Sequence, residues 1–209
     1  MINLAKEMIA SGELGEIRSY RGIHAEDYMS NANDPFTFRH DPAGGGALAD
    51  LGSHALATAE FLLGEIKEVM GDCINLISER PEIGGGNKAV QVDDIGRAFV
   101  RFSNGASGYV EGNWVATGRK MQHDFEVHGS KGMISAENQR PVSIEIATSK
   151  GFTKPPLHHF FMTRYIQAYE NELDHFIQSL MHNSNIHPNG HDGLNALIIA
   201  EAAYSSLKS

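Results

Sequence analysis

The chain is poor in the features that mark secreted, membrane-spanning and nucleic-acid-binding proteins. A single cysteine, Cys73, excludes a disulfide framework within the chain and fits a reducing compartment. No apolar run approaches the roughly 20 residues that a membrane-spanning helix needs. The segment from Met1 to Glu7 is amphipathic and mixed in charge, unlike a signal peptide. Basic residues number 17 against 26 acidic ones, a net charge of -9, which disfavours nucleic acid or an anionic membrane as a partner. We therefore expect a cytoplasmic protein.

What the chain does contain is ordinary for one globular domain. Its 209 residues, 41% hydrophobic and 21% charged, suffice for one sizeable core. The pattern of apolar residues predicts helices near both ends and a block of strands between them. This grouping predicts an α+β fold, an open and predominantly antiparallel sheet with helices on one face. The expected helices are residues 2–11 and 48–63, one running through Tyr165, Tyr169 and Leu180, and one capped by Asp192; the expected strands are residues 16–25, 66–77, 92–102, 106–115, 121–128, 132–137 and 142–146.

The most informative segment is Gly44-Gly45-Gly46-Ala47-Leu48-Ala49-Asp50-Leu51-Gly52-Ser53-His54. Its glycine triplet opens the expected helix, and Asp50 and His54, four residues apart, project from one helical face. No Lys-Ser or Lys-Thr follows the glycines, so a tight turn beside a ligand is favoured over a phosphate-binding loop. Spacing alone favours a simpler interpretation, in which Asp50 is a charge in the first helical turn and His54 a surface histidine.

The whole segment resembles the Gly-Gly-Gly-x-Leu-x-Asp-x-Gly-x-His signature of the glucose-fructose oxidoreductase/inositol dehydrogenase (Gfo/Idh/MocA) family. Those enzymes are sugar and cyclitol dehydrogenases that use a nicotinamide cofactor, and the signature lies in their second domain. The resemblance covers nearly the whole chain and implies the fold of that substrate-binding and oligomerisation domain. Weaker elements occur in the same order: Leu4-Ala5-Lys6-Glu7, Gly12 to Ile17, Val92-Asp93-Asp94, Thr117-Gly118-Arg119, His128 to Gly132, Arg164-Tyr165, Glu172-Leu173 and Asp192-Gly193-Leu194.

The chain departs from the family pattern in three places. Ala57 stands where the family usually has a further acidic residue. The family's catalytic lysine lies in a Glu-Lys-Pro motif, which these residues lack; Lys154-Pro155 follows Thr153 in a late loop and is no substitute. There is also no Gly-x-Gly-x-x-Gly fingerprint of a Rossmann unit. We therefore expect residues 1–209 to be a single substrate-binding and oligomerisation domain without the N-terminal Rossmann domain. Alone it would bind no cofactor and turn nothing over, with NAD or NADP belonging to the parent enzyme.

The resemblance implies roles for particular side chains. His54 would transfer the hydroxyl proton, because a histidine titrates near working pH, and Asp50 would orient it or bind a substrate hydroxyl. Arg119, Gln122 and His123, near the start of a strand, would face the sugar, since groups that donate and accept hydrogen bonds suit a polyol. A solvated strand end explains each of them equally well. Arg39, just before the glycines, has the same two interpretations.

Two other functions remain open at this point. A stand-alone carbohydrate-binding or assembly module would need no cofactor. A metal-dependent hydrolase or isomerase could use Asp50 and His54 with His24 or His123 as a third ligand, although no Cys pair or His-Glu-x-x-His run supports a metal. The expected partners are a sugar or cyclitol, a separate nucleotide-binding domain, and further copies of this chain in a homodimer or tetramer. Such an assembly would form through the bare sheet face, because apolar neighbours such as Phe99-Val100 and Trp114-Val115 point to opposite faces.

Overall fold

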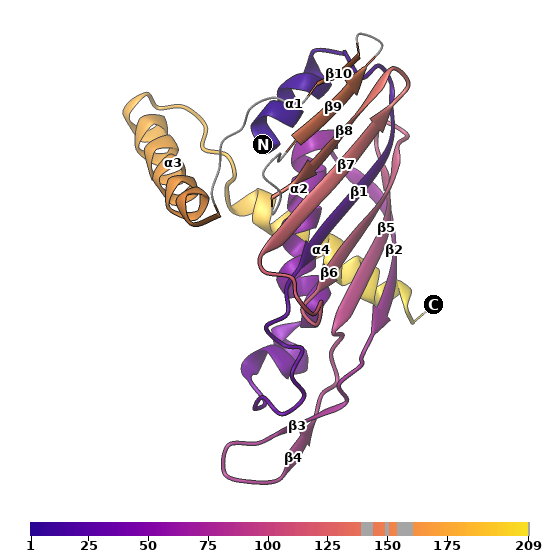
Figure 1. The fold of residues 1–209 in the computed structure, drawn as a ribbon, viewed down its shortest axis with the longest axis vertical. Coiled ribbons are helices and arrows are strands. Elements are labelled where there is room, and N and C mark those ends of the chain that lie inside the picture. The colour runs from indigo at the N-terminus through magenta and orange to yellow at the C-terminus, as the bar shows by residue number, and fades with distance from the viewer. Residues whose placement is uncertain (139–143, 149–150, 154–160, 209) are drawn as a thin grey trace.

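The computed structural model describes residues 1–138, 144–148, 151–153 and 161–208, with the side chains of 152–153 and 161–167 outside the description. The predicted helices and strands form close to their expected bounds (Figure 1). The helical segments are α1 (Ile2–Ala10), the short turns Phe38–His40 and Pro42–Gly44, the π-helical turn η3 (Leu48–Gly52), α2 (Ser53–Leu63), α3 (Phe161–Met181) and α4 (Gly190–Ser206). The strands are β1 (Ile17–Ala25), β2 (Ile66–Ile74), β3 (Glu79–Pro81), β4 (Asn87–Ala89), β5 (Ile95–Phe102), β6 (Ser107–Asn113), β7 (Gln122–Gly129), β8 (Gly132–Glu137), β9 (Ile144–Thr148) and β10 (Gly151–Thr153).

Eight strands form one open sheet in the order β10-β9-β8-β7-β1-β6-β5-β2. Every neighbouring pair is antiparallel except β1 and β6, which run parallel. The strands β3 and β4 make a separate hairpin that extends below the sheet (Figure 1). The predicted α+β class with an open, predominantly antiparallel sheet is confirmed. The parallel pair matters for function, because it brings the carboxyl ends of β1 and β6 to the same edge.

Helices α1, α2 and α4 cover one face of the sheet (Figure 1). Leu56 and Leu62 of α2 and Ala203 of α4 are buried with Tyr20 and Val110 of the sheet in one core cluster. Ile144 and Ile146 of β9 belong to the same core, as their alternation predicted, whereas Val142 lies outside the described residues. Within the described residues, none of the helices combines the length and the apolar character needed to cross a bilayer.

Within the described residues, no helix covers the opposite sheet face, which is partly apolar. Phe99 is 44% exposed there and pairs in register with Met70, which is 59% exposed, while Val100 points into the core. The expectation that Phe99 and Val100 serve opposite faces is confirmed. The same expectation for Trp114 is wrong, because Trp114 follows the end of β6 and is fully buried in a second, smaller cluster with Leu51.

The start of the signature helix lies directly on the sheet because the strands beneath it carry glycine. Gly112 of β6 pairs with Gly96 of β5. A Cβ on Gly112 would lie 2.9 Å from the Cα of Gly52 and would overlap the carbonyl oxygen of Ala47. Only a strand without side chains at these positions lets η3 approach so closely.

The C-terminal helices differ from expectation in two details. Asn189, not Asp192, caps α4: its side chain accepts a hydrogen bond from the His191 amide, and Asp192 completes a capping box from the third helical position. Helix α3 departs from the expected layer of helices on one sheet face: it lies apart from that layer in Figure 1, and Tyr169 is 54% exposed. The side chain of Tyr165 lies outside the described residues.

Candidate functional site

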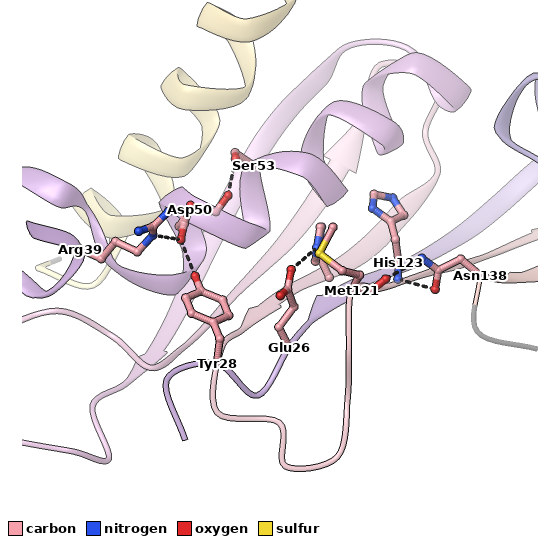
Figure 2. Close-up of polar contacts among 9 residues, drawn as sticks. Glu26, Tyr28, Arg39, Asp50, Ser53, Met121, His123 and Asn138 are labelled. Atoms are coloured by element: carbon pink, nitrogen blue, oxygen red, sulfur yellow. Dashed lines mark hydrogen bonds and ion pairs between the residues drawn. The ribbon is translucent and has the colours of Figure 1, made fainter. Parts of the chain in front are cut away.

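A cavity of about 340 Å³, open to solvent, lies where the end of β1 meets the signature segment. This volume falls in the range of small-ligand sites. Glu26 and Tyr28 follow β1, and Asp50 and His54 come from η3 and α2. Figure 2 shows Tyr28 and Arg39 pointing at the carboxylate of Asp50, with Glu26 beside them. The residues that line the cavity are Glu26, Tyr28, Arg39, Asp50, Leu51 and His54.

Two donors hold the carboxylate of Asp50 at one oxygen. The Tyr28 hydroxyl donates to Oδ2 at 2.6 Å, and Arg39 Nε donates to the same atom at 3.1 Å. Burial, together with the neighbouring Asp50, raises the pKa of Tyr28 well above its usual value, so the phenol keeps its proton and remains a donor. Among the described residues, nothing hydrogen-bonds to Asp50 Oδ1. A fixed carboxylate therefore presents one free acceptor to the cavity.

His54 lines the same cavity but does not pair with Asp50. The described residues contain no ion pair within 4.0 Å between these two side chains, and His54 is exposed. The sequence predicted a regular α-helix from residue 48, whereas Leu48–Gly52 forms a π-helical turn. A π-turn is wider than an α-turn, and such turns are frequent at functional sites. Asp50 and His54 therefore both line the cavity, but Asp50 does not hold His54 by a direct hydrogen bond.

Behind His54 lies a cluster of three histidines. The ring centroid of His24 is 5.0 Å from that of His54 and 5.2 Å from that of His123. Burial, with His123 and His54 alongside, lowers the pKa of His24 to about 3. Burial and then His54 lower the pKa of His123 to about 4. Both rings are therefore neutral near pH 7. The described residues contain no set of three His, Cys, Asp or Glu side chains arranged to hold a metal ion.

The neutral His123 has a defined hydrogen-bond partner. Its Nε2 lies 3.0 Å from the Thr58 hydroxyl, which itself donates to the backbone oxygen of His54 at 2.9 Å. Because the hydroxyl proton is already used, Nε2 of His123 must carry the donated proton. Figure 2 also shows Asn138 beside this strand start, where its side chain accepts from the His123 amide at 3.0 Å.

The four residues expected to bind substrate lie in different places. Arg39 lines the cavity. His123 lies behind it, next to His24. Gln122 is buried and donates to Asp124, and Arg119 is exposed in the loop between β6 and β7; neither lines the cavity.

Sequence reasoning missed Glu26 and Tyr28. The available signal was their place in a polar run, Ala25-Glu26-Asp27-Tyr28, directly after a predicted strand. The segment is fixed from both sides, since the Glu26 amide donates to Asn113 O at 2.8 Å and its carbonyl accepts from the Ala116 amide at 2.9 Å. Glu26 and Tyr28 therefore lie in a backbone segment that hydrogen bonds hold beside the cavity.

The glycine triplet serves as a tight turn, as predicted. Gly45 and Gly46 have φ values of 90° and 80°, which glycine adopts without strain. The buried carboxylate of Asp93 accepts a hydrogen bond from the Leu48 amide at 2.9 Å and another from the Tyr204 hydroxyl at 2.7 Å. A Cβ on Gly46 would overlap this carboxylate. Asp93 and Tyr204 therefore fix the start of the turn that carries Asp50.

Comparison with known proteins agrees with this architecture. The family model described as GFO/IDH/MocA C-terminal domain matches residues 2–135, more than half of the chain. The chain belongs to the GFO/IDH/MocA family. The inositol 2-dehydrogenase of Rhizobium meliloti (strain 1021) is 43% identical over 164 residues, which cover 78% of this chain and 48% of that protein. The myo-inositol 2-dehydrogenase of Thermotoga maritima is 30% identical over 204 residues, covering 97% and 57%.

Solved structures of GFO/IDH/MocA relatives share the fold. A levoglucosan dehydrogenase in complex with NADH and L-sorbose has a TM-score of 0.86 at 29% identity, over 98% of this chain and 60% of that one. An NAD binding oxidoreductase from Klebsiella pneumoniae has a TM-score of 0.90 at 27% identity, over 99% and 61%. The chain thus spans about half the length of the curated relatives that it matches.

Proposed function

We propose that residues 1–209 are the substrate-binding and oligomerisation domain of an NAD- or NADP-dependent dehydrogenase that acts on a sugar or a cyclitol. The observation that supports this most is the cavity in which Asp50, with one free carboxylate oxygen, and His54 face the same space. The relatives named above are an inositol dehydrogenase and a levoglucosan dehydrogenase, and a ligand with several hydroxyls agrees with that lining.

In this proposal each group does a separate part of the work. Asp50 Oδ1 accepts a hydrogen bond from one substrate hydroxyl, while Tyr28 and Arg39 hold the carboxylate in its orientation. His54 takes the proton from the hydroxyl that is oxidised, since an imidazole within reach of a hydroxyl is an effective general base. A nicotinamide cofactor on a nucleotide-binding domain supplies the hydride acceptor. Residues 1–209 contain no Gly-x-Gly-x-x-Gly or Glu-Lys-Pro segment, so we propose that they bind no NAD(P) by themselves and act in the cytoplasm with a separate nucleotide-binding domain.

The test is a titration of the 209-residue chain with millimolar myo-inositol. Binding is measured from the shifts of backbone amide signals in NMR spectra. Asp50→Asn should raise Kd about tenfold or more, because a hydrogen bond to a charged acceptor becomes one to a neutral group. Asp174→Asn is the matched control, since Asp174 is exposed on α3 and does not line the cavity.

Equal affinity of D50N and the parent chain would contradict the proposed site. NADH fluorescence in the same samples separates the remaining alternatives. Cofactor binding at micromolar concentration would contradict the division of labour proposed here. A polyol bound on the far side of the molecule, with shifts away from residues 26–54, would favour a stand-alone carbohydrate-binding module.

The bare sheet face supports the proposed oligomerisation. Phe99 packs on Tyr109 with ring centroids 5.5 Å apart. Phe99 and Met70 are both exposed on this face. We expect light scattering at micromolar concentration to give a dimer or tetramer. Phe99→Asp should lower the measured mass to that of a monomer, because a charge buried in an apolar interface has no partner. Ile83→Asp, on the distant β3–β4 hairpin at a position 88% exposed, should change nothing. A monomeric parent chain would contradict this expectation.

A further inference from the structure

Glu26 occupies the cavity without a strong partner of its own. Its side chain is 17% exposed and lines the same space as Asp50 and His54. Its one hydrogen-bond contact among the described side chains is His24 Nε2, at 3.4 Å from Oε1, which is long for a hydrogen bond. Its other oxygen, Oε2, has no partner within the described part of the chain. A mostly buried carboxylate in this state is costly unless a ligand supplies a donor.

The charges around Glu26 select the kind of donor. Burial raises the pKa of Glu26, and the neighbouring carboxylates of Asp50 and Asp27 raise it further. The nearby cations are already engaged, Arg39 with Asp50 and Lys120 with Asp27 at 2.7 Å. An anionic ligand such as a sugar phosphate or an aldonate would add to this repulsion. A neutral hydroxyl donates a hydrogen bond and relieves it.

His24 restricts where the carboxylate of Glu26 lies, although the contact is long. The ring is buried, its Nδ1 has no hydrogen-bond partner among the described residues, and its Nε2 faces Glu26. Since His24 is neutral near pH 7, only one ring nitrogen carries a proton, and the adjacent carboxylate favours the tautomer with that proton on Nε2. The backbone of Glu26 is held by Asn113 and Ala116, so this contact restricts the remaining freedom of the side chain.

We infer that Glu26 is a second substrate-binding carboxylate, which accepts a hydrogen bond from another hydroxyl of an uncharged polyol, and that His24 is its positioning residue. The inference rests on the proposed function and deepens it. Asp50 and Glu26 would each bind one hydroxyl, at two points of one polyol, while His54 faces the hydroxyl that is oxidised. Phosphorylated and carboxylated sugars would be excluded by the same pair of charges.

The experiment compares myo-inositol with its monodeoxy analogues on the 209-residue chain and its variants by NMR titration. In the parent chain, the analogue that lacks the hydroxyl bound by Glu26 should bind about tenfold more weakly than inositol. In Glu26→Gln, inositol itself should lose about tenfold, and that analogue should no longer differ from it. His24→Gln, whose amide can replace Nε2, should keep the discrimination, while His24→Leu should lose it.

The outcomes separate this inference from the proposed function. A parent chain that binds no inositol would overturn both. Binding that D50N weakens and E26Q leaves unchanged would overturn the inference and leave the proposed function standing. An E26Q variant that still discriminates against the same analogue would also overturn the inference, because Glu26 would then not contact that hydroxyl. Unfolding midpoints of all variants equal to that of the parent chain show that the changes are local.

Discussion

Replacing Gly112 with alanine is expected to lower the free energy of unfolding by about 3 kcal/mol or more, since an added methyl group must displace backbone on a packed face. The new Cβ would lie 2.9 Å from the Cα of Gly52 and overlap the carbonyl of Ala47. Both are backbone atoms at the start of the signature helix, so no side-chain rotation relieves the overlap. The turn that carries Asp50 must move off the sheet, and polyol binding should weaken with it.

The measurement is chemical unfolding followed by the fluorescence of the single tryptophan, Trp114, which is fully buried. Gly193→Ala is the matched control. A Cβ there meets no atom within 4 Å, and the position lies inside α4. That change should stabilise the protein by roughly 0.5–1 kcal/mol, because alanine favours helix over glycine. Equal stability of G112A and the parent chain would mean that the signature helix does not rest on the glycines of β5 and β6.

Mild acid, between pH 7 and pH 5, is expected to destabilise the protein through two buried histidines. In the folded state the pKa of His24 is about 3 and that of His123 about 4, against an ordinary value of 6.5. Both histidines are therefore neutral when folded and gain protons on unfolding below pH 6.5. The stability is complete above that value and is lost as the pH falls toward the folded pKa values. Linkage gives a loss of about 2 kcal/mol for each histidine between pH 7 and pH 5.

Unfolding curves at several pH values test this expectation. His123→Gln should remove about half of the slope between pH 7 and pH 5, because the glutamine keeps a donor for Thr58 and does not titrate. His128→Gln should keep the full slope, since the side chain of His128 is 46% exposed. The comparison between variants cancels the carboxylates that titrate in the same range. Parallel curves for H123Q and the parent chain would refute the buried neutral cluster.

Part of the candidate site was predictable from the sequence, because its signals are local. The glycine triplet, Asp50 and His54 belong to one short segment, and helical periodicity already puts the last two near one face. Arg39 precedes the same segment and lines the cavity as expected. Arg119 and Gln122 do not line the cavity, because nearness to a strand end does not say which way the chain turns afterwards. The loop containing Arg119 leads away from the cavity lining, and Gln122 is bonded to Asp124.

The sequence by itself determined the family, the α+β class and the segment that begins the site, since each depends on periodicity or on a contiguous motif. Only the tertiary structure decided the rest. Glu26 and Tyr28 line the same cavity as Asp50 because β1 runs parallel to β6 and ends beside η3. The π-turn forms where a glycine-bearing sheet, the Asp93 carboxylate and the Tyr204 hydroxyl meet. Such contacts join residues far apart in the sequence, as between Ala49 and Tyr204, 155 positions apart, and no local pattern encodes a register between such distant segments.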